Sequence, residues 1–123
     1  PVVQYIHKSL PFSELVVLYR AADVLLVTPF QDGMNLVAKE YVAARVDDEG
    51  ALVLSEFAGA AEELTDSFLV NPYDTEGLKD QIEAAVRMEP DEEQRRMAAL
   101  RETVRDNDLD AWAKAFLALL SMA

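Results

Sequence analysis

The sequence contains no cysteine and only one histidine, His7, in 123 residues. It therefore lacks disulfides, thiolate nucleophiles and cysteine metal ligands, and a lone histidine excludes a multi-histidine metal site. Glycine is scarce at four residues, and neither a G-x-G-x-x-G pattern nor a Walker lysine motif occurs. No apolar run reaches the length of about 18 residues typical of a membrane helix. No signal-peptide pattern opens the sequence, and we expect a cytoplasmic location.

Basic side chains are outnumbered, with 11 Lys and Arg against 23 Asp and Glu, which gives a net charge of −12. This balance argues against a nucleic-acid surface, which needs clustered positive charge. The acidic excess is not spread evenly. Residues 1–45 hold four basic and four acidic side chains, so the whole of the −12 lies from residue 46 onward. An anionic ligand is therefore expected in the neutral first third of the chain.

Hydrophobic residues make up 51% of the chain, which predicts one folded domain. Short apolar runs predict strands at residues 2–6, 24–28, 51–55 and 67–71. Helical periodicity predicts helices at 11–22, about 34–45, 60–64, 75–87, 90–105 and 109–120. Ser13 and Thr75 are expected to cap two of these helices. Such alternation predicts an α/β fold in which a parallel, Rossmann-like sheet carries helices on both faces.

We interpret residues 1–123 as a single partial domain, because four strands are few for a doubly wound sheet. Its last segment, residues 109–123, is expected to form a C-terminal amphipathic helix. An apolar stripe on this helix is formed by Leu109, Trp112, Phe116 and Leu119.

The segment TPFQDGMNLVAKEY, residues 28–41, carries the pattern most indicative of a binding site. A buried strand ends here, a loop with Asp32 and Gly33 follows, and a helix begins near Met34. Ligands of open α/β sheets bind at the carboxyl ends of the strands. The first-turn amides of a helix lack intrahelical acceptors and carry the positive end of its dipole, so they can bind a phosphate. Gly33 would let the ligand approach the backbone.

Two carboxylates bracket this turn. If Asp32 is the N-cap residue, Glu40 lies about two turns into the helix and about 80° around it. Both side chains could then accept hydrogen bonds from sugar hydroxyls on either side of a bound diphosphate. The alternative is structural: Asp32 could act only as an N-cap, and Glu40 could face solvent. However, the helix is apolar on most faces, and a carboxylate on a buried helix needs a partner.

The stretches YRAADVLLVTPFQDGMNLVAKEYVAAR, GALVLSEFAGAAEEL and FLVNPYD resemble the C-terminal part of the trehalose-6-phosphate synthase family. This is glycosyltransferase family 20, a group of retaining transferases with the GT-B fold of two Rossmann-like domains. The resemblance implies that the chain is the later part of the C-terminal, donor-binding domain. It also implies transfer of glucose from a nucleotide-glucose, usually UDP-glucose, to glucose 6-phosphate, with trehalose 6-phosphate as product.

The resemblance also implies a role for each residue of the segment. Asp32, with the backbone of Gly33, Met34 and Asn35, would bind the donor glucose. The amides of Leu36 and Val37 would bind the diphosphate, and Glu40 would bind the ribose hydroxyls. Neither a cofactor nor a metal is implied, and no residue acts as nucleophile or base, because the leaving diphosphate helps to deprotonate the attacking hydroxyl.

Two departures from the family pattern bear on activity. Gln31 stands where the family commonly has Arg, and the family's diphosphate-binding Arg and Lys lie upstream of this sequence. The acceptor site belongs to the N-terminal domain. We therefore expect the chain alone to be catalytically silent. Two alternatives remain open: a related glucosyltransferase with another acceptor, and an inactive fragment that acts by association, for example as a homo-oligomer.

Overall fold

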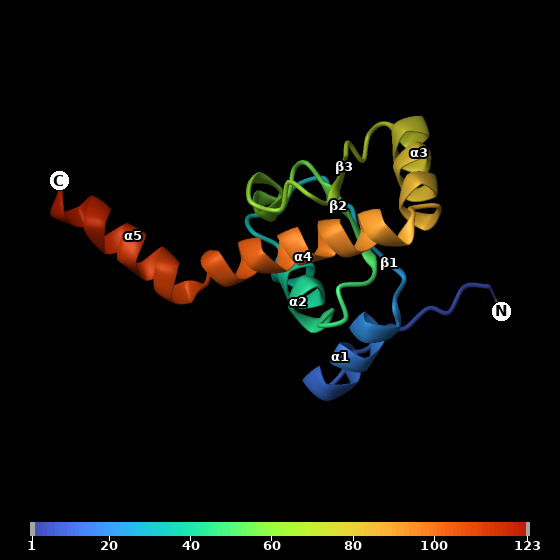
Figure 1. The fold of residues 1–123 in the computed structure, drawn as a ribbon, viewed down its shortest axis with the longest axis horizontal. Coiled ribbons are helices and arrows are strands. Elements are labelled where there is room, and N and C mark those ends of the chain that lie inside the picture. Colours follow the sequence, from blue (N-terminus) through green and yellow to red (C-terminus); the bar gives the residue numbers. More distant parts are fainter. Residues whose placement is uncertain (1, 123) are drawn as a thin grey trace.

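A computed structural model describes residues 2–122 of the chain as an α/β domain with a projecting C-terminal helix (Figure 1). Three strands form the sheet: β1 (Val24–Val27), β2 (Ala51–Ser55) and β3 (Phe68–Val70). The helices are α1 (Phe12–Ala21), α2 (Leu36–Ala44), the 3-10 turn η1 (Gly59–Glu62), α3 (Thr75–Val86), α4 (Pro90–Asp106) and α5 (Leu109–Ser121).

The sheet is parallel, in the order β1-β2-β3. Its central strand β2 is buried along its whole length, as its apolar sequence ALVLS predicts for a strand covered on both faces. Neighbouring strands align Leu25 with Leu52, and Leu54 with Leu69. Because all three strands run the same way, their carboxyl ends and the loops that follow them meet at one edge of the sheet.

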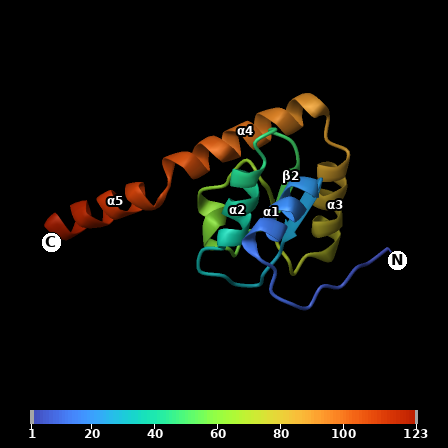
Figure 2. The same cartoon turned by 90° about the horizontal axis from the view of Figure 1, so that it is seen from below.

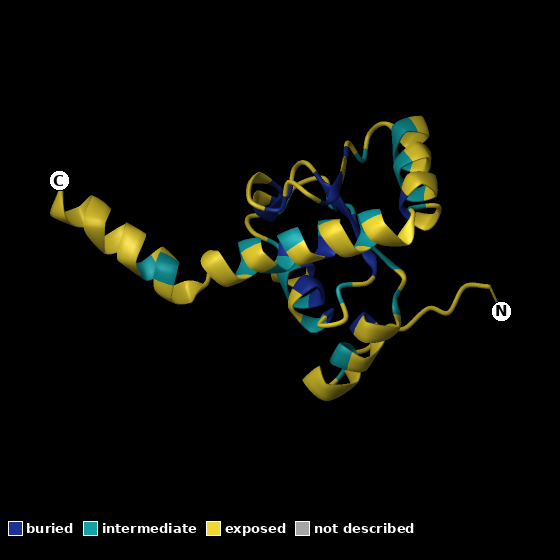
Figure 3. Ribbon diagram, viewed as in Figure 1, coloured by how far each residue is buried: buried dark blue, intermediate teal, exposed yellow. Residues whose placement is uncertain are grey.

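Helices cover both faces of this sheet, as predicted (Figure 2). On one face, Leu52 and Leu54 pack in a cluster with side chains from α1, α2 and α4. On the other face, Val53 and Phe68 pack against α3 through Ala85. The period-2 alternation of β2 explains this division, since successive side chains point to opposite faces. Figure 3 shows the buried residues concentrated in these layers.

The strand predicted at residues 2–6 is wrong. This segment has no regular secondary structure, and Val2, Val3 and Tyr5 are exposed. A strand is stable only when a neighbour completes its hydrogen-bond ladder, and within residues 2–122 this segment pairs with no strand. His7, next to it, is exposed and contacts the hydroxyl of Tyr5 at 3.0 Å through Nδ1.

Both predicted helix caps are displaced. The N-cap of α1 is Pro11, which leaves Ser13 inside the helix, and the N-cap of α3 is Asp74 rather than Thr75. The Asp74 carboxylate accepts a hydrogen bond from the amide of Gly77 at 3.0 Å. Aspartate caps at least as well as threonine, and it stands one residue earlier in the sequence.

Helix α5 projects from the domain (Figure 1), as an extension beyond α4. It confirms the helix predicted from residue 109, with Asp108 as its N-cap, and residue 123 lies outside the described residues. Its apolar stripe is exposed, with Leu109 at 79% and Trp112 at 57% of their full accessible surface. Within residues 2–122, no helix has the length and apolar character needed to cross a bilayer.

Candidate functional site

The loops after β1 and β2 are joined by backbone hydrogen bonds at the carboxyl edge of the sheet. The amide of Asp32 donates to the carbonyl of Phe57 at 3.3 Å, and the amide of Gly59 donates to the carbonyl of Asp32 at 3.1 Å. The amide of Ala60 donates to the carbonyl of Met34 at 2.7 Å. An isolated parallel bridge between Asp32 and Ala58 continues the sheet beyond its strands. The predicted binding loop is therefore fixed to the sheet by its main chain.

Two glycines lie where these loops cross, and they differ in their surroundings. A Cβ atom at Gly33 would meet no atom within 4 Å, so the loop borders open space there. A Cβ atom at Gly59 would lie 2.1 Å from the carbonyl oxygen of Gly33. Gly59 thus permits the close approach of the two loops, while the backbone of Gly33 borders open space.

Asn35, and not Asp32, is the N-cap residue of α2. Its Oδ1 accepts a hydrogen bond from the amide of Ala38 at 3.0 Å, and its backbone has φ 74°. Asparagine is among the few residues that adopt a positive φ without large strain. Asp32 precedes the helix by four residues, so the angle of about 80° that we predicted between Asp32 and Glu40 on one helix does not apply.

Asp32 instead closes the turn that leads into α2. Its Oδ2 accepts a hydrogen bond from Nδ2 of Asn35 at 3.1 Å, and its Oδ1 accepts one from the amide of Met34 at 3.3 Å. Asp32, Met34 and Asn35 are therefore brought together, as the predicted site requires. The side chain of Asn35 makes one hydrogen bond through each of its polar atoms within the turn, Nδ2 to Asp32 and Oδ1 to Ala38.

The amides of Leu36 and Val37 open the helix, and neither has an acceptor within residues 2–122. Both residues are exposed. Helix α2 also carries no acidic residue in its first turn, in contrast to the first turns of α1, α3, α4 and α5. An acidic side chain there would offset the positive end of the helix dipole. The start of α2 therefore offers two unpaired donors and an uncompensated dipole to an anion.

Glu40 lies one turn further along α2, on the same side as Leu36, because residues four apart share a helix face. It is half-buried, and its Oε2 accepts a hydrogen bond from the hydroxyl of Tyr19 at 2.9 Å. Glu40 therefore does not simply face solvent, and its partner is a residue of α1. Within residues 2–122, no hydrogen bond joins Glu40 to Asp32.

This contact affects the phenol of Tyr19. Burial, together with the hydrogen bond to the Glu40 carboxylate and its negative charge, raises the pKa of Tyr19 to about 12. All three effects favour the neutral phenol, because a phenolate would lose solvation, lose its hydrogen bond to Glu40 and face a second negative charge. Tyr19 is therefore a hydrogen-bond donor throughout the physiological pH range.

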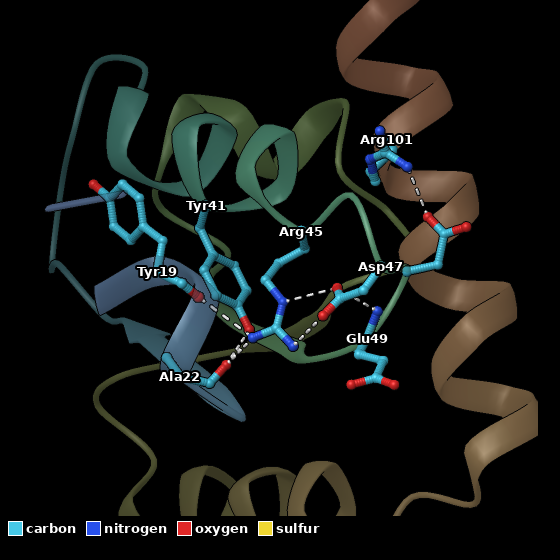
Figure 4. Close-up of polar contacts among 8 residues, drawn as sticks. Tyr19, Ala22, Tyr41, Arg45, Asp47, Glu49 and Arg101 are labelled. Carbon is cyan, nitrogen blue, oxygen red and sulfur yellow. Dashed lines mark hydrogen bonds and ion pairs between the residues drawn. The ribbon is translucent and has the colours of Figure 1, made fainter. Parts of the chain in front are cut away.

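A buried arginine fixes α1 against α2 (Figure 4). Arg45, only 3% exposed, donates through Nη1 to the carbonyls of Tyr19 and Ala22, and pairs with the carboxylate of Asp47 at 3.2 Å. The hydroxyl of Tyr41 donates to the same Ala22 carbonyl at 2.9 Å. These carbonyls end α1, where a helix leaves acceptors unsatisfied. Sequence reasoning missed both Tyr19 and Arg45, since no local pattern pairs them.

Lys39, the basic side chain of α2, forms an ion pair with Glu63 in which Nζ lies 2.6 Å from Oε2. Its side chain is 16% exposed, so the pair is partly shielded from solvent. The pair borders a groove of about 660 Å³ between the start of α2 and helix α5, where Leu36 and Trp112 also line the wall. Within residues 2–122, no three His, Cys, Asp or Glu side chains are grouped so as to hold a metal ion.

A parallel sheet covered on both faces, with an open helix N-terminus at its carboxyl edge, defines an α/β domain of the doubly wound class, in which ligands generally bind at that edge. The sequence pattern of glycosyltransferase family 20 matches residues 1–122, and the chain therefore belongs to this family. The trehalose-6-phosphate synthase of Mycolicibacterium smegmatis is 60% identical over 121 residues, which are 98% of this chain and 24% of that protein. The chain thus spans about a quarter of the length of the curated relatives that it matches.

Solved structures are similar along nearly the whole chain. One is a trehalose-6-phosphate protein from E. coli bound with UDP-2-fluoro glucose, with a TM-score of 0.89 and 42% identity over 97% of this chain and 27% of that one. Another is an α,α-trehalose-phosphate synthase (UDP-forming) from Burkholderia xenovorans in complex with glucose-6-phosphate, with a TM-score of 0.89 and 44% identity over 95% of this chain and 26% of that one. These GT-B neighbours confirm the predicted fold class.

Proposed function

We propose that the chain is the donor-binding part of a glucosyltransferase that moves glucose from a nucleotide-glucose to glucose 6-phosphate and forms trehalose 6-phosphate with retention. The observation that carries the proposal is family membership over residues 1–122, together with an open helix start at the segment DGMNLVAKE. Similar structures bound with UDP-2-fluoro glucose and with glucose-6-phosphate support the donor and the acceptor.

Each part of the donor has a counterpart at the start of α2. Asp32 and the backbone of Gly33, Met34 and Asn35 bind the glucose. The unpaired amides of Leu36 and Val37 bind the diphosphate, which is the group that a helix N-terminus favours. Glu40 accepts hydrogen bonds from the ribose hydroxyls, and no metal or cofactor takes part.

These residues promote transfer by binding the leaving group rather than by attacking the sugar. As the bond from glucose to the diphosphate breaks, negative charge grows on the diphosphate oxygens. Amides that are already oriented toward this position stabilise that charge without reorganising. Asp32 and Glu40 hold the sugar and the nucleoside on either side and so fix the reacting carbon in place.

The donor is proposed to be UDP-glucose, and the acceptor to bind mainly to parts of the enzyme outside this chain. The cytoplasm is the proposed location, because both proposed substrates are phosphorylated metabolites. Without the remaining parts, the 123-residue chain is expected to turn over no donor. Release of UDP by the purified chain from UDP-glucose and glucose 6-phosphate would contradict this expectation.

A chimera tests the proposal. The chain replaces the corresponding region of the M. smegmatis synthase, and UDP release is measured with UDP-, ADP- and GDP-glucose. Glu40→Ala in this chimera should lower kcat/KM for the donor by about 5- to 150-fold, the equivalent of about 1–3 kcal/mol. Glu83→Ala, an exposed carboxylate on α3 across the sheet, is the matched control and should leave kcat/KM unchanged. Unchanged donor kinetics in Glu40→Ala would remove Glu40 from the site.

Association through α5 is a second candidate function, favoured by the exposed apolar stripe of Leu109, Trp112, Phe116 and Leu119. An apolar surface of this kind is unusual on an isolated domain in water. Light scattering across a range of protein concentrations tests it. A mass that rises with concentration supports association, and a constant monomer mass excludes it.

A further inference from the structure

The hydroxyl of Tyr19 donates a hydrogen bond to Glu40, although Tyr19 lies on α1 and the residues of the proposed donor site lie on α2 and in the loop before it. Tyr19 is 4% exposed, and its hydroxyl donates to Oε2 of Glu40 at 2.9 Å. A buried hydroxyl without a partner is unfavourable, and here the carboxylate is the partner. One oxygen of Glu40 is therefore occupied from the side of α1, while Oε1 has no hydrogen-bond donor within residues 2–122.

Tyr19 is itself held at two further points. Its carbonyl accepts a hydrogen bond from Nη1 of Arg45 at 3.3 Å, and Arg45 is in turn paired with Asp47. Its ring packs edge-on against Tyr41, with ring centroids 6.1 Å apart and an angle of 75° between the planes. In Figure 4 the carbonyl of Tyr19 turns toward Arg45, while its ring extends away. The phenol is thus a fixed donor rather than a mobile one.

A fixed donor matters because glutamate has three rotatable side-chain bonds. The Cβ of a helical residue is tilted toward the helix N-terminus, so Glu40 leans toward the turn with the free amides of Leu36 and Val37. Without Tyr19, its carboxylate could take up several orientations there. With Tyr19 in place, the Glu40 carboxylate is held in one orientation, and the lone pairs that Tyr19 does not use point in a fixed direction. A carboxylate that accepts from two adjacent hydroxyls needs such a fixed orientation.

We propose that Tyr19 is a positioning residue that orients Glu40 toward the vicinal hydroxyls of the donor ribose, and that it thereby sets the discrimination between ribo- and 2′-deoxyribonucleotides. This inference rests on the proposed function of Glu40. It adds a residue from α1 to a site otherwise built from α2 and the loop before it, and it assigns the ribose selectivity to a pair of side chains rather than to Glu40 alone.

Binding of UDP and of 2′-deoxy-UDP to the chimera tests the proposal by titration calorimetry. Tyr19→Phe removes the hydroxyl and keeps the ring. It should weaken UDP binding by about fivefold and 2′-deoxy-UDP binding by less than about twofold, since only UDP offers both hydroxyls to Glu40. Equal loss for the two ligands would mean that Tyr19 only supports the fold, and no loss would mean that Glu40 needs no orienting. Either result overturns the proposal.

Tyr41→Phe is the matched control. Tyr41 is a buried tyrosine of the same cluster, but its hydroxyl donates to the carbonyl of Ala22 and not to Glu40. Loss of that hydroxyl should lower the melting temperature and leave the ratio of the two affinities unchanged. A change of this ratio as large as in Tyr19→Phe would assign the effect to packing and overturn the proposal.

Glu40→Gln separates the inference from the proposed function. If this variant leaves both affinities unchanged, Glu40 is not at the ribose, and the proposed function of this residue fails first. If it abolishes the discrimination but Tyr19→Phe does not reduce it, only the role of Tyr19 is overturned. In the double variant, the phenylalanine should add less than about twofold to the effect of Glu40→Gln, because coupled residues are not additive.

Discussion

The two glycines at the crossing of the loops should respond differently to replacement by alanine: Gly59→Ala should destabilise the fold, whereas Gly33→Ala should leave stability unchanged and weaken the proposed donor binding. In Gly59→Ala, the new Cβ would lie 2.1 Å from the carbonyl oxygen and 2.9 Å from the carbonyl carbon of Gly33. Real Cβ contacts essentially never fall below 3.0 Å, so the backbones must separate by about 1 Å. Neither atom belongs to a side chain that could rotate away.

The separation has a cost that can be estimated. Overpacking of this kind costs about 1–3 kcal/mol. It also strains the hydrogen bonds from Gly59 to Asp32 and from Ala60 to Met34, each worth about 1 kcal/mol. We therefore expect a loss of about 3 kcal/mol in the free energy of unfolding. With a urea slope of about 1.5 kcal/mol/M, the unfolding midpoint of the chain falls by about 2 M.

Gly33→Ala is the counterpart, because its Cβ would meet nothing within 4 Å. Its unfolding midpoint should stay close to that of the unchanged chain, with a free-energy change within about 0.5 kcal/mol. In the chimera, the methyl group would occupy space proposed for the donor, and KM for UDP-glucose should rise by about tenfold. A midpoint change for Gly59→Ala of less than about 0.3 M would refute the close-approach argument.

Two further predictions concern the start of α2 and the phenol of Tyr19. Asn35→Ala removes the cap and places alanine at φ 74°, so it should cost about 2 kcal/mol in urea unfolding, whereas Asn35→Gly tolerates that φ and should cost about 1 kcal/mol less. An equal loss in both variants would show that the positive φ contributes nothing. Folding raises the pKa of Tyr19 from 10.0 to about 12, so the protonated phenol stabilises the folded chain below pH 10, and this contribution of up to about 3 kcal/mol is lost as the pH rises toward 12. Unfolding at pH 9 and pH 11 should therefore show a smaller pH dependence in Tyr19→Phe, and an identical dependence would contradict the raised pKa.

Much of the fold could be predicted because its signals are local. The apolar run ALVLS indicated a strand buried on both faces, and the 3.6-residue period marked α3, α4 and α5. Residues 2–6 show the limit of this reasoning, since a β-branched run has strand propensity whether or not a partner strand is present. The caps of α2 and α3 were misplaced because several polar side chains near a helix start compete for the same amides. Helix α1 has no side-chain cap, since it begins after Pro11.

The candidate site likewise has a part that local sequence signals predict and a part that depends on tertiary packing. Its backbone part, the amides of Leu36 and Val37 beside Gly33, follows from the position of a loop between a strand and a helix. The partner of Glu40 could not be predicted, because Tyr19 is 21 residues away and reaches Glu40 only through the packing of α1 on α2. The carbonyl partners of Arg45 depend on the same packing, since both carbonyls lie at the end of α1.

The bridge between Asp32 and Ala58 links the segment after β2 to the turn before α2, so substitutions in one segment affect the other. The segment after β2 forms backbone hydrogen bonds with the turn before α2. The main chain of that segment therefore fixes the positions of Asp32 and Met34. A change at Ala58 or Gly59 would shift Asp32 and Met34, and with them the surroundings of the proposed donor site. If the proposed donor site is correct, differences in donor preference among homologues can originate in the segment after β2 as well as in the residues of the site itself.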